Sequence, residues 1–469
     1  MNYPIGNHPG SDGSAATSGI RYVTDVPYIA GFTAELAPEW LDLIATICGF
    51  AAPERENGFA WCELGCGPGM APIIFAATHP EGQFHGVDAM PDHIVRGRSL
   101  AEQAGIGNLA FHALDFEKAC GLDLPQFDYI VAHGVYAWID ETAAASLRRF
   151  IARHLKPGGL VYVSYNAMPG WAADGPFQHL LYALAEGGGG DSIARFHAAA
   201  DLAETLRKAG AGALGASPTA VGFVDERTKR PDAYFAHEYL APAWRPRYVD
   251  EVRRDMAEIG LVPVGSATLR DNFDSFVLRA KAREALEAIA DPDQRELARD
   301  YFMFQRFRRD VFGLDVRVID DAERRARLFG TTFALMRPAS LIEFKMVTEA
   351  GELAFDNPVA RGLAVKLAEG PRTLGDCLAP GADAQDLLAN ALSLCCAGFI
   401  RPVAARAVAV DRLNTVFLEA LDAKTESTFR VMPRGTAMRI DGQILVALRD
   451  GKRLPDAVAP WVEFLQRCG

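Results

Sequence analysis

The sequence predicts an α/β protein whose main domain is a Rossmann-like, largely parallel β-sheet covered by helices on both faces. Two observations predict this class. Strand-like and helix-like segments alternate from residue 59 to residue 164, and a glycine-rich loop joins the first strand to its helix. The chain has 469 residues, of which 49% are hydrophobic, so it is long enough for two or three domains.

Five strand–helix units follow one another in this stretch. The predicted strands are residues 59–64, 83–87, 109–113, 127–132 and 160–164, and the predicted helices include 71–78, 91–104 and 143–155. Residues 156–159, Lys-Pro-Gly-Gly, are predicted to form a turn before the fifth strand. Five such units in register are hard to obtain by chance.

After Trp171 the alternation stops, and residues 172–232 are predicted to form a helical insertion that a run of four glycines interrupts. The sheet is then predicted to resume. An amphipathic helix is expected at residues 248–259 and two closing strands at 261–269 and 275–279. This order is typical of the end of a seven-stranded sheet, so we place the main domain at residues 20–280.

The two ends of the chain differ from this domain. Residues 1–19 are rich in Gly, Ser, Ala and Asn and are predicted to be a disordered tail. Residues 281–469 are predicted to be a mainly α-helical C-terminal domain that begins with a charged helix at 282–310. Three helices (358–369, 374–378 and 386–396) and a strand (398–403) suggest a winged-helix-like module at about 355–405. Its third helix offers few groups that could read DNA, so packing or protein contact is its expected role.

Composition narrows the function classes. The formal net charge of −12 repels a phosphate backbone, so we expect no nucleic-acid partner. No apolar run approaches the roughly 20 residues of a membrane helix, and no signal peptide is visible, so we expect no membrane insertion and a cytoplasmic protein. The eight cysteines form no CxxC pair, which predicts packed thiols and no metal site. A homodimer is compatible with the sequence.

The strongest functional signal is the loop Glu63-x-Gly65-x-Gly67-x-Gly69 between the first strand and its helix. Glycines allow a tight turn and the close approach of a ligand, and the helix start presents free N–H groups to a carboxylate. The last glycine comes two residues after the second, unlike the GxGxxG spacing of dinucleotide sites, which favours a methionine moiety over a pyrophosphate. We therefore predict S-adenosyl-L-methionine as the cofactor.

Acidic residues end the next two strands. Asp88 can accept hydrogen bonds from both ribose hydroxyls, as it also would for NAD. Asp115 can accept from the adenine amino group while Phe116 packs on the ring. Together with Glu63, these carboxylates are expected to line the crevice at the carboxyl ends of the strands. The predicted cofactor-binding residues are Glu63, Gly65, Cys66, Gly67, Gly69, Asp88, Ala89, Asp115, Phe116 and His133.

The fourth and fifth strands lead into two segments, 133–138 and 165–171, that are predicted to form the acceptor site. His133 can be a general base or a structural residue, with equal weight. Aromatic rings at these strand ends can shape a pocket for an amine or belong to the core. The predicted catalytic residues are His133, Tyr136, Tyr165, Asn166 and Trp171, with Trp138 as a further pocket residue. The segment 236–240, Ala-His-Glu-Tyr-Leu, is expected either to cap the site or to be a structured connection.

Several of these segments resemble bacterial methyltransferases that carry a methyltransferase regulatory domain, a group that includes protein lysine methyltransferases of outer-membrane proteins. The most specific are Tyr-Asn-x-x-Pro-Gly-Trp at 165–171 and Arg-Phe-Arg-Arg-Asp at 306–310; 127–136 and 237–240 also match. The resemblance covers about residues 20–400 and places the regulatory domain at about 220–310. It implies an enzyme that N-methylates lysine in a protein or peptide. The alternatives are a small-molecule acceptor and a non-catalytic, cofactor-binding scaffold.

Overall fold

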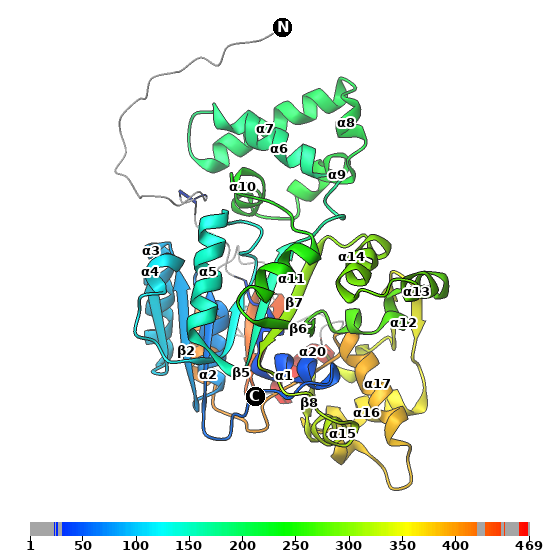
Figure 1. Cartoon of the computed structure of the whole chain (residues 1–469). Coiled ribbons are helices and arrows are strands. Elements are labelled where there is room, and N and C mark those ends of the chain that lie inside the picture. Colours follow the sequence, from blue (N-terminus) through cyan, green and yellow to red (C-terminus); the bar gives the residue numbers. More distant parts are fainter. Residues whose placement is uncertain are drawn as a thin grey trace.

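A seven-stranded sheet forms the centre of the protein (Figure 1). The computed structural model describes residues 23, 25–26, 31–419, 427–441, 445 and 459–467, so the predicted tail at 1–19 lies outside the described residues. The strand order is β3-β2-β1-β4-β5-β7-β6. The strands are β1 (Phe59–Leu64), β2 (Gly82–Asp88), β3 (Leu109–Ala113), β4 (Phe127–Ala132), β5 (Leu155–Asn166), β6 (Leu261–Ser266) and β7 (Phe307–Leu314). β7 runs antiparallel to both of its neighbours, β5 and β6, whereas the other neighbouring strands are parallel, and the predicted Rossmann-like sheet is confirmed.

Helices cover both faces of the sheet, so every residue of β1 and β4 is buried, as expected for central strands of a parallel sheet. One face packs against α1 (Pro38–Ile47), α2 (Met70–Thr78) and α3 (Pro91–Ala104). The other face packs against α4 (Phe116–Ala119), α5 (Glu141–His154) and α11 (Val249–Ala257). The predicted strands and helices of the first five units agree with these bounds to within two residues, except that β5 starts earlier.

The closing part of the sheet differs from the prediction. Residues predicted as a strand at 275–279 largely form helix α12 (Asp274–Val277), and the predicted charged helix at 282–310 is α13 (Ala280–Glu287), α14 (Pro292–Met303) and then β7. Asp291 caps a new helix through its side chain, and Phe304 ends that helix with a φ of 47°. The sheet therefore extends to residue 314, beyond the expected domain end at 280.

The predicted turn at 156–159 is also wrong, because these residues belong to β5. The pairing of β5 with β4 shifts register between Phe127 and Tyr129, and this irregularity accommodates the Pro-Gly-Gly segment. Lys156 forms an ion pair with Asp128 on β4, 2.7 Å away, which helps to hold the segment against its neighbour.

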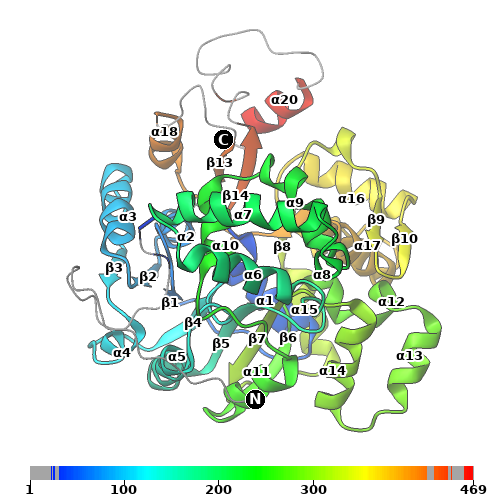
Figure 2. The same ribbon diagram turned by 90° about the horizontal axis from the view of Figure 1, so that it is seen from above.

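The helical insertion is confirmed and runs from α6 to α10. Its helices are α6 (Gly175–Glu186), α7 (Ser192–Lys208), α8 (Gly212–Gly215), α9 (Pro218–Arg227) and α10 (Asp232–Leu240). They share an aromatic core that includes Phe177, Phe196, Phe223 and Tyr239. Figures 1 and 2 show the insertion above the carboxyl ends of the central strands, with α10 on its lower side. The insertion therefore forms a roof over this edge of the sheet.

The C-terminal region is mainly helical and packs on the face that α1–α3 cover. Its helices are α15 (Asp321–Gly330), α16 (Pro358–Ala368), α17 (Ala384–Cys396), α18 (Asp411–Glu419) and α20 (Ala459–Arg467). Short strands β8 (Thr332–Leu335), β11 (Arg372–Thr373) and β12 (Ile400–Pro402) form one small sheet; β9 (Lys345–Thr348) pairs with β10 (Gly351–Ala354), and β13 (Ser427–Met432) with β14 (Thr436–Asp441).

The predicted helix at 374–378 is only a short 3₁₀ turn, Gly375–Cys377, and the winged-helix likeness stays a prediction. Across the described part of the chain, no helix combines the length and the apolar character that crossing a bilayer requires.

Candidate active site

A cleft of about 820 Å³ lies between the insertion and the carboxyl ends of β1, β2, β4 and β5. In the sheet, β1 has β2 on one side and β4 on the other, so the strand order reverses at β1. The cleft lies at this point, which is where ligands bind in open α/β sheets. The cleft is partly open, and its size suits a cofactor with a second reactant. Predicted residues on its wall are Gly65, Gly67, Asp88, Ala89, Asp115, Phe116, His133, Trp138 and Asn166.

The glycine loop has the backbone conformation that its sequence predicts. Gly65, Gly67 and Gly69 have φ values of 75°, 54° and 79°, in the left-handed region that favours glycine. A Cβ on Gly65 would lie 2.5 Å from the Val135 side chain, and one on Gly69 would collide with the Phe111 ring. Gly69 thus serves the turn itself, whereas Gly65 and Gly67 face the cleft.

Cys66 packs through its side chain, as expected for the thiols of this chain, although it was also counted among the cofactor-binding residues. Its side chain belongs to a buried core cluster, and burial raises the pKa of its thiol. A buried, protonated thiol is inert, so the side chain packs, and this residue can meet a ligand only through its backbone.

Asp88 holds the loop in place. Its Oδ2 accepts a hydrogen bond from the Gly67 N–H at 2.8 Å, and its Oδ1 accepts from the Met90 N–H at 2.9 Å. His93 Nδ1 lies 3.1 Å from the same Oδ1. Glu63 is buried directly behind the loop, and burial together with the nearby Asp88 charge raises its pKa. Asp88 therefore supports the loop and also lies on the cleft wall, whereas Glu63 is buried and lies off that wall.

Replacing Asp88 with alanine should weaken the binding of S-adenosylhomocysteine by at least about tenfold. The change removes both backbone hydrogen bonds that fix the loop, and each contributes on the order of 1 kcal/mol. Isothermal titration calorimetry measures the affinity. Asp92→Ala, an exposed acid on the same helix–loop segment, is the matched control and should leave the affinity unchanged. Equal affinities for both variants would contradict this role of Asp88.

The part of the cleft that Asp115 and Phe116 line is suited to an adenine ring. Asp115 caps α4, because its side chain accepts a hydrogen bond from the Lys118 N–H at 2.8 Å. Phe116 follows it, half-buried on the cleft wall beside Ala89. The ring offers a flat apolar surface and the carboxylate a hydrogen-bond acceptor, and their contact with adenine stays a prediction.

His133 lies on the other side of the loop with a neutral side chain. Its Nδ1 is 2.9 Å from the Tyr162 hydroxyl and 3.1 Å from Ser164 Oγ. Burial, aided by the charge of Arg309, lowers its pKa to about 4. An imidazole with this pKa is a poor acceptor for the proton of an ammonium group. The low pKa and the contacts with Tyr162 and Ser164 therefore favour a structural or orienting role for His133 over that of a general base.

Of the residues predicted as catalytic, Asn166 has the position that best suits contact with a ligand in the cleft. It ends β5, is 6% exposed and lies on the cleft wall. Among the described residues, no acceptor lies within hydrogen-bond distance of its Nδ2. Because a buried amide without a partner is costly, this group fits a ligand that completes its hydrogen bonds.

Three predicted catalytic residues lie away from the cleft wall. The Tyr136 hydroxyl donates to Asp255 at 2.7 Å, and the Tyr165 hydroxyl donates to Asp310 at 2.5 Å. Both side chains are fully buried. Trp171 donates from Nε1 to the Arg306 carbonyl at 3.0 Å and lies under its guanidinium. Side chains alternate along a strand, so Asn166 faces the cleft and Tyr165 turns to the core.

Four further residues on the acceptor side were missed as site residues or were only loosely indicated. Phe307 starts β7 and meets the His133 ring edge-on, with ring centres 6.0 Å apart. Arg230, Tyr234 and Glu238 reach the cleft from the insertion. Phe307 stands in the Arg-Phe-Arg-Arg-Asp motif at 306–310, and Glu238 in the polar-aromatic segment at 236–240, for which a capping role was one of two alternatives.

The cleft has the groups that S-adenosylmethionine requires. Two left-handed glycines let a ligand approach the backbone, an acid ends β2, and an aromatic ring with a second acid follows β3. The unpaired Asn166 amide lies toward the acceptor end. Fold and cleft together define a class I, S-adenosylmethionine-dependent methyltransferase.

Comparisons with known proteins agree with this class. Residues 55–187 match a family described as a methyltransferase domain, and residues 231–313 match one described as a predicted methyltransferase regulatory domain. The uncharacterized protein sll1526 of Synechocystis is 36% identical over 355 residues, which cover 76% of this chain and 70% of that protein. The chain therefore belongs to the family of S-adenosylmethionine-dependent methyltransferases that carry this regulatory domain.

Two other proteins are similar in part or in fold. The structure of PKMT2 from Rickettsia typhi in complex with AdoHcy has a TM-score of 0.66 at 20% identity and covers 94% of this chain and 91% of its own. Trans-aconitate 2-methyltransferase from Methylobacterium nodulans is 30% identical over 153 residues, covering 31% of this chain and 54% of that enzyme. The protein is thus an enzyme that uses S-adenosyl-L-methionine.

Proposed function

We propose that this enzyme transfers methyl groups to the side-chain amine of lysine in a protein or peptide. The observation that carries the proposal is the charge of the cleft. Its described lining has five carboxylates, from Asp88, Asp115, Glu117, Asp140 and Glu238, and one guanidinium, from Arg230. An acidic, partly desolvated cleft attracts a cationic acceptor and repels anionic ones such as a phosphate backbone.

The acceptor end also suits an alkyl amine in shape. Trp138, Tyr234 and Phe307 place aromatic side chains on its wall, and such rings can enclose a lysine stem and favour a nearby cation. The Asn166 amide lies on the wall of the same cleft and can orient the nitrogen for in-line attack. The bound cofactor supplies the electrophilic methyl group; the protein aligns the acceptor and excludes water.

A small-molecule acceptor is the second candidate, because Arg230, Tyr234 and Glu238 of the insertion line part of the cleft. An enclosed site would favour such an acceptor, whereas the partly open cleft leaves room for a segment of a protein. A carboxylic-acid acceptor fits poorly, since it would meet the excess of carboxylates. This makes an amine-bearing metabolite the most reasonable form of the alternative.

The test is to incubate the enzyme with S-adenosylmethionine labelled in its methyl group and a cell extract, then to separate macromolecules from small solutes. We expect label in protein and, after digestion, mass spectrometry to find Nε-methyllysine. Label confined to small solutes would favour the second candidate, and label on other protein side chains would contradict lysine as the acceptor. The Gly67→Asp variant of the glycine loop, which is expected to bind the cofactor weakly, is the negative control.

A further inference from the structure

Glu238 has an unusual place among the acids of the cleft. It belongs to α10 of the insertion and lines the same cleft as His133 and Asn166. Among the described residues, no group donates a hydrogen bond to its carboxylate and no cation forms an ion pair with it. The Arg230 charge acts on it only at longer range. Its carboxylate is therefore available to a ligand.

Other acids of the cleft already have structural partners. Asp88 accepts from two backbone N–H groups of the loop, and Asp115 caps α4. Asp140 caps α5, because it accepts from the Ala143 N–H at 3.0 Å. Glu117 is exposed and follows Phe116 at the adenine end. Glu238 is the one cleft carboxylate that the described part of the insertion contributes, and such contacts do not occupy it.

The surroundings of Glu238 suit reversible protonation. Burial raises its pKa to about 7, and the charge of Arg230 opposes this rise only in part. The other titratable groups on the cleft wall are Tyr234 and His237 of α10, Asp88, His93, Asp115, Glu117, His133 and Asp140. A carboxyl with a pKa near the working pH can both take up a proton and release it in each turnover.

We propose that Glu238 binds the ammonium group of the substrate lysine and accepts its proton before methyl transfer. This inference rests on the proposed lysine specificity. An ammonium has no lone pair, so one N–H bond must first break, with its proton passing to a Glu238 oxygen. The neutral nitrogen then gives its lone pair to the methyl carbon, the carbon–sulfur bond breaks, and sulfur keeps that electron pair. Glu238 afterwards releases its proton to water.

The experiment compares Glu238→Gln with wild-type enzyme and with Glu186→Gln, an exposed control on α6 of the same insertion. Calorimetry gives the affinity for S-adenosylhomocysteine. Transfer of labelled methyl groups to lysines of the protein extract is measured as kcat/KM from pH 6.5 to pH 9.5. Glutamine keeps the size of the side chain but cannot accept the proton.

For Glu238→Gln, we expect unchanged affinity for S-adenosylhomocysteine and kcat/KM reduced by about 100-fold at pH 7. The deficit should shrink toward pH 9.5, because free lysine loses its own proton near pH 10.4, and a purely structural role would not produce this trend. A loss below about threefold, a deficit independent of pH, or weakened cofactor binding would overturn the assignment while leaving lysine as acceptor. Wild-type enzyme that labels no lysine would instead overturn the proposed function and this inference with it.

Discussion

A Gly67→Asp variant should bind S-adenosylhomocysteine at least about 100-fold more weakly than the wild-type enzyme, a difference of roughly 3 kcal/mol. Gly67 has a φ of 54°, and its N–H donates to Asp88 Oδ2 at 2.8 Å. A carboxylate at this position would stand close to Asp88, with Glu63 buried behind the loop. Two acids would then stand close together on the surface that receives the cofactor, and the new side chain would occupy part of its space.

Matched variants separate charge from size. A Cβ at Gly67 would meet no heavy atom within 4 Å, so Gly67→Ala should cost only the strain of a positive φ, about 1 kcal/mol. Gly67→Asn has nearly the same shape as the aspartate variant without its charge and tolerates the left-handed region equally well. Calorimetry should rank the affinities Ala, Asn, Asp from strong to weak. Wild-type affinity in Gly67→Asp would refute the assignment of the loop.

The cofactor half of the site was predictable because its signals are local. Left-handed turns require glycine, so the spacing of Gly65, Gly67 and Gly69 is visible in the sequence, and each acid ends a recognisable strand. The acceptor half depends on which face a side chain takes and on contacts distant in sequence. Nothing local distinguishes Asn166, which faces the cleft, from Tyr165, which packs in the core.

The end of the sheet was missed for a related reason. β7 carries Arg308 and Asp310 at positions that would be apolar in an ordinary buried strand, and both are about 5% exposed. Because of these two charges, the sequence pattern of β7 resembles the end of a polar helix and not a buried strand. Only the partners on α14, which the sequence does not place, make this burial physically acceptable.

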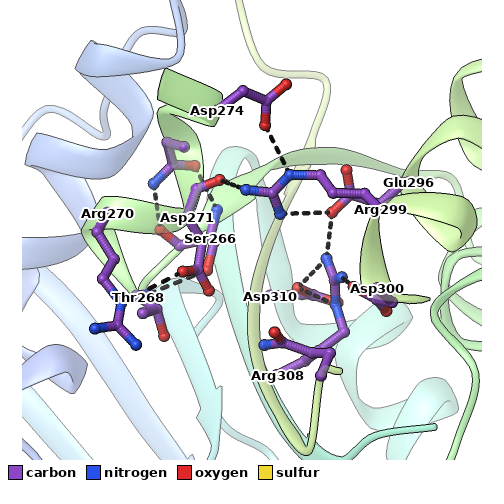
Figure 3. A network of polar contacts seen from close by, with 12 residues as sticks. Ser266, Thr268, Arg270, Asp271, Asp274, Glu296, Arg299, Asp300, Arg308 and Asp310 are labelled. Carbon is purple, nitrogen blue, oxygen red and sulfur yellow. Dashed lines mark hydrogen bonds and ion pairs between the residues drawn. The ribbon is translucent and has the colours of Figure 1, made fainter. Parts of the chain in front are cut away.

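Removing the Arg308 guanidinium should have the largest effect on stability. Arg308 lies between three carboxylates (Figure 3). Its Nη1 donates to Asp300 at 2.5 Å, its Nη2 to Glu296 at 2.7 Å, and Asp310 accepts at 3.0 Å. The network joins α14 to β7 and, through Asp310, to the Tyr165 hydroxyl of β5. It therefore connects the edge of the regulatory domain to the strand that carries Asn166.

Arg308→Met should lower the free energy of unfolding by about 3–5 kcal/mol at pH 7.5, because it leaves buried carboxylates without a counter-charge. Urea denaturation measures this change. Arg254→Met, which removes an exposed guanidinium paired with Asp250 on α11, should change stability by less than about 0.5 kcal/mol. A loss for Arg308→Met as small as that of the control would mean that the buried network does not organise this edge of the sheet.

The stability that the Arg308→Met variant loses should depend on pH in a definite direction. Burial raises the pKa of Asp300 to about 7 even beside Arg308, so in the variant the folded state should bind protons more readily than the unfolded chain. Stability of the variant is then highest below the unfolded pKa and is lost as the pH rises through the folded pKa. The deficit should shrink on acidification from pH 8 to pH 5. Adding Asp300→Asn to Arg308→Met should restore part of the lost stability at pH 8, because it removes one uncompensated charge at the place where the missing guanidinium acted.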